Sequence, residues 1–361
     1  MLSILQILKK YQDEKQKLKD QGASSGAGAG QSGPDGSGPA GLSLSADAAV
    51  SVFNAVNREI EDERLSRVRE FYSTALDWAR RIYSLELKTQ AEFRSQFVPF
   101  AQQAVGVYNL NDKNFLFQCL HDYEKIDDYI YCHAVNVAFM SVELGRGMNY
   151  TPARLTELFC AAFMHDIGIM PFIDLVRKPG VLAPEEYARI KEHPLKGLEI
   201  LNQLGGEFSP GMIEAITQEH ERTDGSGYPK GLREGNIGEF AQIVCLADVY
   251  EALTHSRPHR KRLSPPKAVN EILDRKNIFS VRALKMLLER IGIFPVGTWV
   301  RLNTKETGIV FKHNHGLPLR PAVQVLFAEN GAKLLQPKLV DLASNLLISI
   351  EECLENQYNP R

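Results

Sequence analysis

Hydrophobic and polar residues follow a helical period over most of this chain. Between residues 48 and 85, Val52, Val56, Ile60 and Leu65 recur at steps of four or five residues, and apolar residues continue at similar steps to Ile82. Such spacing places apolar side chains along one face of a helix. We predict a helical segment over 48–110, which is either a dimerising helical pair or the first helices of the main domain.

The chain begins with a second amphipathic pattern. In "MLSILQILKKYQDEKQKLKD" a few apolar residues are followed at once by lysines, which predicts an amphipathic helix over residues 1–20, either a poorly ordered tail or a docking peptide for a partner. The apolar stretch is too short to cross a bilayer, and we expect no membrane span elsewhere in the chain. Residues 21–47 are rich in Gly, Ser, Ala and Pro, which predicts a flexible linker.

The remaining sequence divides into two regions with different patterns of hydrophobic and polar residues. Residues 111–293 show helical periodicity interrupted by turn sequences such as "RKPG" and "DGSGYPKG". Beyond them, "PVGTWVRLN", "TGIVFKHN" and "PAVQVLFAENG" are short runs of β-branched and aromatic residues separated by Gly, Asn and Pro. We therefore predict a mainly α protein, in which a helical bundle over 111–293 is followed by a small antiparallel β module and a C-terminal tail over 294–361.

Composition narrows the range of partners. The 361 residues include 44% hydrophobic and 24% charged residues, as in ordinary globular proteins, and the net charge is −2. This balance gives no reason to expect a nucleic-acid polymer as the main partner. The five cysteines show no CxxC spacing, which is typical of reduced thiols in a cytoplasmic protein.

The run "AAFMHDIGIMP" places His165 and Asp166 among apolar residues. An imidazole and a carboxylate buried there are costly unless each has a partner. A lone His-Asp pair proves little, because the chain contains another, His121 and Asp122, in a mixed polar sequence that predicts an exposed surface. The neighbours of His165 and Asp166 in space therefore decide their role.

Further imidazoles and a carboxylate stand on other predicted helices. Each alone is most simply a hydrogen-bonded core or capping residue, but helical bundles build metal sites from such residues on several helices. These residues are His133, His193, His220 and Asp248. Together with His165 and Asp166 they offer mixed nitrogen and oxygen ligands, which suit two metal ions such as Fe or Mn. Asp166 could bridge the two metals, and such a pair generates hydroxide at neutral pH.

The ordered motifs of this region strongly resemble those of the HD-GYP family, a branch of the HD phosphohydrolases. They are "HDIG", "RKPGVLAPEEYARIKEHPLKG", "HERTDGSGYPKGL" and "LADVYEALTHSRPHR", within residues 133–267. The resemblance implies a metal-dependent phosphodiesterase that hydrolyses the bacterial second messenger cyclic di-GMP to pGpG, GMP or both. The β module is similar to a C-terminal addition found on some members of the family.

Carried over by position, the resemblance implies roles for individual residues. His165 and Asp166 would serve catalysis by holding a metal-bridging hydroxide that attacks phosphorus in line. Gly227, Tyr228 and Pro229 would shape the substrate mouth and contact partners. Arg257 and Arg260 would contact substrate phosphate, although a solvated basic loop explains them equally well. The implied metal ligands are His133, His165, Asp166, His193, His220 and Asp248.

Three positions depart from the family pattern. Ile169 stands where the family has a lysine expected to hold a phosphate oxygen. Glu219 replaces a histidine and is a further candidate ligand. Tyr129 replaces a glutamate that supports a third metal in some members, so we expect two metals.

These departures leave alternatives to an active enzyme open. One is a weak or inactive cyclic-dinucleotide sensor or interaction protein that retains the metal site. Another is a phosphodiesterase for a different cyclic dinucleotide. A regulatory protein partner at the Gly-Tyr-Pro loop or the N-terminal helix, and a homodimer, are further expectations.

Overall fold

A computed structural model describes residues 66–119, 129–178, 180–205, 207–257, 261–314 and 316–354, without the side chains of residues 109–118. The N-terminal helix expected over 1–20 and the linker expected over 21–47 lie outside the described residues. The same holds for His121, Asp122 and Arg260.

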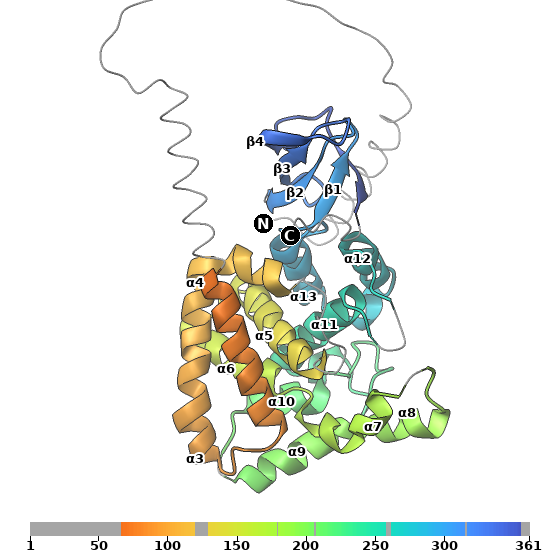
Figure 1. Cartoon of the computed structure of the whole chain (residues 1–361). Helices are drawn as coiled ribbons and strands as arrows, with labels where there is room; N and C mark the ends of the chain where they lie inside the picture. The colour runs from red at the N-terminus through yellow and green to blue at the C-terminus, as the bar shows by residue number, and fades with distance from the viewer. Residues whose placement is uncertain are drawn as a thin grey trace, which may run out of the picture.

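The described chain is mainly helical, with a small antiparallel sheet near its C-terminal end, so the predicted fold class is confirmed (Figure 1). A helix over 66–83 is followed by α3 (Gln90–Glu92), η1 (Phe93–Phe97), α4 (Val98–Cys119), α5 (Tyr129–Gly147), α6 (Pro152–Phe163), η3 (Ile167–Phe172), α7 (Ile173–Val176), α8 (Pro184–Ile190) and α9 (His193–Leu204). Then come α10 (Pro210–Gln218), η4 (Glu234–Asn236), α11 (Glu239–Thr254), α12 (Pro265–Asp274), η5 (Lys276–Ile278), α13 (Val281–Met286) and η6 (Leu287–Ile291).

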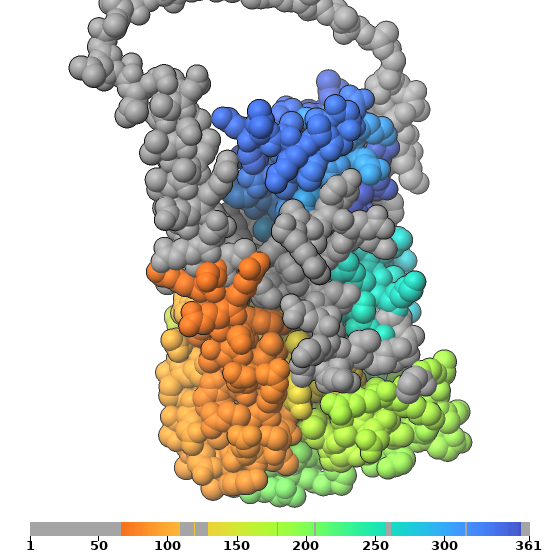
Figure 2. Space-filling view, viewed as in Figure 1, coloured from red at the N-terminus to blue at the C-terminus, as the bar shows by residue number. Residues whose placement is uncertain are grey.

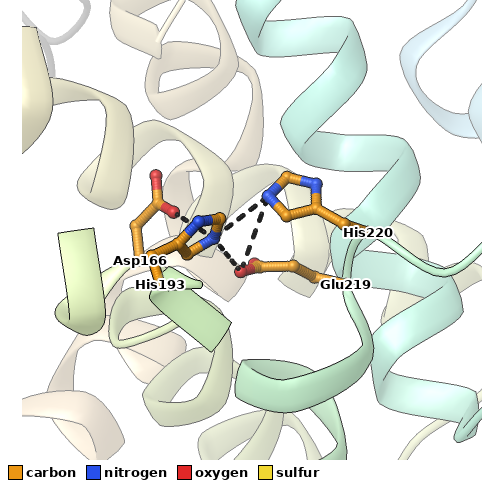
Figure 3. A group of neighbouring side chains, drawn as sticks. All are labelled: Asp166, His193, Glu219 and His220. Atoms are coloured by element: carbon orange, nitrogen blue, oxygen red, sulfur yellow. Dashed lines mark hydrogen bonds and ion pairs between the residues drawn. The ribbon is translucent and has the colours of Figure 1, made fainter. Parts of the chain in front are cut away.

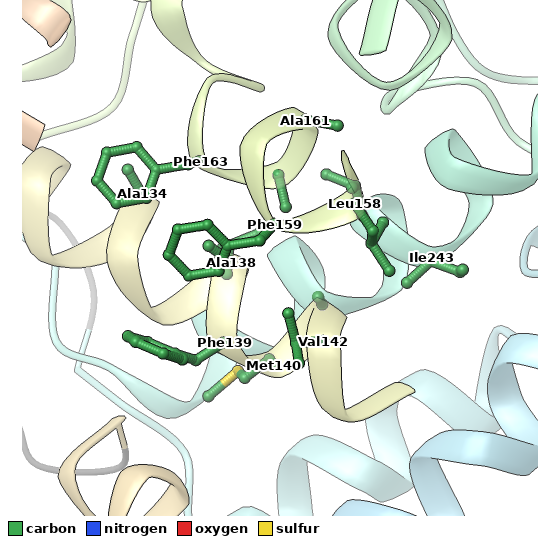
Figure 4. Close-up of a cluster of buried hydrophobic side chains, with 14 of the residues drawn as sticks. Ala134, Ala138, Phe139, Met140, Val142, Leu158, Phe159, Ala161, Phe163 and Ile243 are labelled. Atoms are coloured by element: carbon green, nitrogen blue, oxygen red, sulfur yellow. The ribbon is translucent and has the colours of Figure 1, made fainter. Parts of the chain in front are cut away.

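The core of the bundle is built around α5 and α6. Helix α5 is buried along nearly its whole length, because almost every residue from Tyr129 to Gly145 is apolar or small. Figure 4 shows Phe139 of α5 beside Phe159 of α6, with the rings 5.3 Å apart, and Ile243 of α11 at the same cluster. A helix that is apolar on all sides lies in the centre of its domain. Helix α5 therefore presents His133 to the interior.

The first described helices belong to the same core. Phe97 of η1 packs on Phe163 of α6 with ring centroids 4.9 Å apart, and Phe100 of α4 contacts Phe159 at 6.3 Å. Helix α4 runs without a break through the boundary predicted between residues 110 and 111. In the described region, these first helices share the hydrophobic core of the bundle.

The C-terminal module is one five-stranded antiparallel sheet in the order β4-β3-β2-β1-β5. Its strands are β1 (Trp299–Leu302), β2 (Thr307–Lys312), β3 (Ala322–Phe327), β4 (Lys333–Asp341) and β5 (Ile350–Cys353). A separate cluster around Val300, Val310 and Val323 fills its interior, and Phe294 packs against both this cluster and the helical core. The module thus has its own core and is joined to the bundle at Phe294.

One segment of the described chain, Pro152–Val176, is long and apolar enough to cross a membrane by length and composition, whereas none was expected. It comprises α6, η3 and α7, with His165 and Asp166 between the first two. In its most apolar window 61% of the residues are buried inside the protein. Its apolar residues therefore form part of the bundle core.

Candidate metal centre

The predicted ligands come from separate elements that meet at one place in the bundle. His133 lies on α5, and Asp248 lies on α11, which packs against α5. His165 and Asp166 lie between α6 and η3. Two further groups complete the set: His193, the first residue of α9, and the pair Glu219 and His220, at the C-terminal end of α10.

Four of these side chains form one group of possible ligands, shown in Figure 3. His193 Nε2 lies 3.3 Å from Asp166 Oδ1 and 3.2 Å from Glu219 Oε1. His220 Nε2 lies 3.1 Å from His193 Nε2 and 4.0 Å from Glu219 Oε1. Two imidazoles and two carboxylates thus point their ligand atoms at a common point.

The other three side chains form a neighbouring group. His133 Nε2 lies 3.2 Å from Asp248 Oδ1, and a ring nitrogen of His165 lies within 4.8 Å of ligand atoms of both residues. Asp166 faces both groups, because its Oδ2 lies 3.7 Å from His133 Nε2 and 3.5 Å from His165 Nε2, while its Oδ1 faces His193. Asp166 would therefore be able to contribute an oxygen to either group of ligands.

The outer nitrogens of three histidines are held by hydrogen bonds. His165 Nδ1 lies 2.7 Å from the Ala162 carbonyl oxygen, and His193 Nδ1 lies 2.8 Å from that of Ile190. His133 Nδ1 lies 2.5 Å from Glu251 Oε2. When Nδ1–H donates to an oxygen, the tautomer leaves the Nε2 lone pair for a metal, and the ring orientation is fixed. All three Nε2 atoms therefore face the point where a metal ion would bind.

The electrostatics of the centre are dominated by carboxylates placed in a largely buried site. Burial opposes ionisation of Asp166, but His165, His193 and His133 outweigh it and lower the pKa of that carboxyl. Burial raises the pKa of Glu219 well above its ordinary value, and Asp166 and Asp248 add to the rise. Burial and His193 lower the pKa of His220 to about 3. The centre therefore holds a charge on Glu219 at a high cost unless further positive charge is supplied.

The residues fit divalent metal ions. His165 Nε2 and Glu219 Oε2 are buried without a hydrogen-bond partner in the described structure, and they lie 3.8 Å apart across the centre. Unsatisfied buried polar atoms are rare in native proteins and require an explanation. A cation bound by both groups satisfies them and neutralises the carboxylates, and the mixed imidazole and carboxylate donors suit metals such as Fe and Mn.

The glycine of the His-Asp motif has a packing role. A Cβ built on Gly168 would lie 2.0 Å from the His193 carbonyl oxygen and 2.3 Å from the Gly197 nitrogen. Gly197 in turn has room only for hydrogen, because a Cβ there would lie 2.5 Å from Ile216 Cγ2. These contacts bring η3 close to the start of α9. They place His193 opposite His165 and Asp166.

The Gly-Tyr-Pro loop packs directly on the segment that carries Glu219 and His220. A Cβ on Gly227 would lie 2.5 Å from the His220 carbonyl oxygen, and the Tyr228 backbone N–H donates to that oxygen at 3.2 Å. The Tyr228 ring stacks on the His220 ring at 4.7 Å. Glu221, which is buried, accepts hydrogen bonds from the Lys230 and Leu232 nitrogens and closes the loop. Pro229 follows a cis peptide bond.

Three other predicted positions are placed as follows. Arg257 directs Nη2 toward Glu251 Oε2 at 3.9 Å. Ile169 is buried in the hydrophobic core. Tyr129, the first residue of α5, is also buried, and burial raises its pKa to about 12. The phenol therefore stays neutral one turn before His133 and offers no carboxylate for a third metal.

The sequence reasoning missed the buried residues that support His133. Glu251 accepts from His133 on one oxygen and from Asn136 Nδ2 on the other at 3.1 Å, and Tyr72 donates to Asn136 Oδ1 at 2.6 Å. Their signal was present in the sequence, because Asn136 and Glu251 stand one helical turn after His133 and Asp248 in otherwise apolar runs. Such partners fix ligand orientation and tune metal affinity.

Two regions of the chain match known family models. Residues 124–278 match the HD domain, and residues 299–359 match a KOW domain associated with the HD domain. The first match includes every histidine and carboxylate of the centre. The resemblance inferred from the motifs is therefore confirmed at the level of the HD domain.

Similar proteins extend the comparison. The chain is 30% identical over 217 residues to the cyclic di-GMP phosphodiesterase PA4108 of Pseudomonas aeruginosa, covering 60% of this chain and 52% of that protein. It is 29% identical over 177 residues to 3'3'-cGAMP-specific phosphodiesterase 1 of Vibrio cholerae, covering 49% and 39%. The match thus spans about half or less of these relatives. The structure of Bd1817, an HDG"Y"P protein from Bdellovibrio bacteriovorus, superimposes with a TM-score of 0.51 at 20% identity, covering 67% of this chain and 79% of that chain, and shares its fold.

Proposed function

Because residues 124–278 form an HD domain, we propose that this chain is a metal-dependent phosphodiesterase that hydrolyses cyclic di-GMP. The observation that carries the proposal is the pair of ligand groups joined by Asp166, whose two oxygens face His193 on one side and His133 and His165 on the other. A relative named as a cyclic di-GMP phosphodiesterase supports the choice of substrate.

Two divalent metals held by these groups would supply activated water and positive charge for cleavage of a phosphodiester. The protein residues prepare the site for that chemistry. The hydrogen bonds of His133, His165 and His193 hold their Nε2 atoms inward without reorganisation when substrate arrives. The Tyr228 phenol stays neutral, because burial raises its pKa, and its ring stacks on the ring of His220.

Several finer statements belong to the same proposal. Fe or Mn as the metals agrees with the mixed donor set. Glu219 is proposed as a ligand in place of the usual histidine, because its free oxygen points at His165. The products are pGpG, GMP or both, and Arg257 and Arg260 contact the substrate phosphate. The enzyme acts in the cytoplasm, where a regulatory protein partner or a second copy of the chain controls its activity.

The test is turnover of cyclic di-GMP by full-length protein purified without oxygen and loaded with Fe(II) or Mn(II). Asp166→Ala, which removes the bridging carboxylate, serves as the blank. We expect linear product from the wild type and none above background from the variant. A metal-replete wild type that forms no product would refute hydrolysis of this substrate.

A second candidate substrate is another cyclic dinucleotide. The similarity to a 3'3'-cGAMP-specific phosphodiesterase favours it, since the same two-metal chemistry serves either molecule. Competition between the two dinucleotides in one assay decides which is the preferred substrate, because the ratio of kcat/KM values measures the preference directly.

Buried Ile169, which cannot hold phosphate, favours a third possibility, a sensor that binds a cyclic dinucleotide without turnover. Dinucleotide binding that survives Asp166→Ala would support the sensor.

A further inference from the structure

The mouth of the centre lacks one expected positive charge. Ile169 is buried in the hydrophobic core and cannot contact an anion. Nearby cations already have partners. Arg222 donates to the Glu219 and Glu221 carbonyl oxygens and to Cys245, and Lys178 donates to both oxygens of Glu186. Beyond Arg257 and Arg260, which are already proposed as phosphate contacts, a further cation for the phosphodiester has to come from another position.

Lys191 is placed to supply that charge. It follows α8 and lies two residues before His193, and its backbone N–H donates to the Tyr187 carbonyl oxygen at 3.1 Å. Its ammonium nitrogen lies 4.8 Å from the centre of the Tyr187 ring and 5.2 Å from that of Tyr228. Cations at such distances are attracted to the ring faces. Two aromatic rings therefore hold this ammonium beside the loop that stacks on His220.

The ammonium of Lys191 is available to an anion. Among the described residues no carboxylate forms an ion pair with it, in contrast to Lys178 and to Lys196, which pairs with Glu199. The side chain is half-buried, so it is close to the site but reachable from solvent. Helices α7 and α8, which precede this residue in the chain, form the protruding yellow-green region at the lower right of Figure 2. Aromatic rings attract an ammonium group but do not neutralise it as a carboxylate would, so its positive charge can still attract a phosphate.

We propose that Lys191 is a substrate-binding residue whose ammonium contacts a phosphate oxygen of the cyclic dinucleotide, with Tyr187 as the residue that positions it. The inference rests on the proposed function for the identity of the ligand. Lysine serves phosphate as a point charge, so one contact at the mouth adds binding without chemistry. Such an interaction is made equally in the ground state and the transition state. It lowers KM and leaves kcat unchanged.

The test compares Lys191→Met, Lys191→Arg and the control Lys333→Met, all loaded with Mn(II) and checked for equal metal content. Lys333 is an exposed lysine at the start of β4, in the C-terminal module. We expect Lys191→Met to raise KM for cyclic di-GMP about tenfold with kcat within about twofold, as for loss of one charged hydrogen bond. Lys191→Arg restores KM, and Lys333→Met leaves it unchanged.

Salt provides a readout that a purely structural role would not change. The KM of the wild type rises with ionic strength more steeply than that of Lys191→Met, because a partly exposed charge contact is screened. Tyr187→Phe keeps the ring and the wild-type KM, whereas Tyr187→Ala raises KM. Equal KM values for the wild type and Lys191→Met, or failure of arginine to restore KM, would overturn the inference while leaving the proposed hydrolysis intact.

If the wild type does not turn over cyclic di-GMP, equilibrium dialysis of the labelled dinucleotide against the same proteins tests the role of Lys191 separately from the proposed hydrolysis. Tighter binding by the wild type than by Lys191→Met supports the role of Lys191 and rejects hydrolysis. Equal binding by both, or no binding by either, rejects the role of Lys191.

Discussion

At the residue scale, Glu219 is the position where this centre differs most from the family pattern. Its buried Oε2 faces His165, and its Oε1 faces His193. We expect Glu219→Gln to lose about one metal per chain and about 10²-fold or more in activity, the scale of a lost charge-stabilising group. Glu219→His, which restores the usual imidazole, should keep two metals. Metal analysis by mass spectrometry beside the rate assay checks both, and two bound metals in Glu219→Gln would show that Glu219 is not a ligand.

Glu251 acts one layer outside the ligands. Because its carboxylate accepts from His133 Nδ1 and from Asn136, it holds the imidazole in the tautomer that presents Nε2. Replacing such a partner typically costs about 10–100-fold in metal affinity. We expect this loss in Glu251→Gln, measured by competition with a metal chelator. Asn136→Ala, which leaves the His133 hydrogen bond in place, should have a smaller effect, and equal losses in the two variants would count against orientation of His133 as the cause.

At the scale of elements, the close crossing of η3 and α9 depends on Gly168. A methyl group there would meet the His193 carbonyl oxygen and the Gly197 nitrogen, which are backbone atoms and cannot rotate away. We expect Gly168→Ala to destabilise the fold by about 3 kcal/mol or more, since overpacking against backbone costs more than against side chains. Thermal unfolding measures the loss. The control Gly235→Ala has open space at its Cβ and should change stability by less than about 0.5 kcal/mol. An unchanged melting temperature in Gly168→Ala would mean that the two elements can separate.

The elements themselves could largely be predicted from sequence, but their contacts could not. Periodicity identified the helical body, and the β-branched runs identified strands that the structure places at β1, β2 and β3. The sequence also drew attention to His133 and Asp248, as polar residues in apolar runs, and their side chains lie 3.2 Å apart. It could not show which oxygen of Asp166 faces which histidine. Nor could it show that Lys191 lies between the Tyr187 and Tyr228 rings, because this contact depends on how the segment between α8 and α9 packs against the Gly-Tyr-Pro loop in three dimensions.

At the scale of the whole molecule, a buried carboxylate of the metal centre lowers the stability of the metal-free fold. Asp166, Glu219 and Asp248 bring three carboxylates to one largely buried place, and burial disfavours the charge of Glu219. A folded protein that binds a cation there gains stability through mass action, about 2.7 kcal/mol for one site at a hundredfold excess over Kd. We therefore expect Mn(II) to raise the melting temperature of the chelated wild type by about 5 °C or more, a shift of the size that this free energy gives in a large domain.

The matched variant Asp166→Asn makes that prediction specific. It removes the carboxylate that His165, His193 and His133 stabilise in the metal-free protein, so its metal-free form should be no more stable than the metal-free wild type, and Mn(II) should raise its melting temperature little. Calorimetry of both proteins with and without Mn(II) gives the four melting temperatures to be compared. If Mn(II) stabilises the two proteins equally, the ion binds elsewhere, and the carboxylates meet at this place for a reason other than metal. A large shift confined to the wild type instead ties the fold of the helical body to the ions that its chemistry needs.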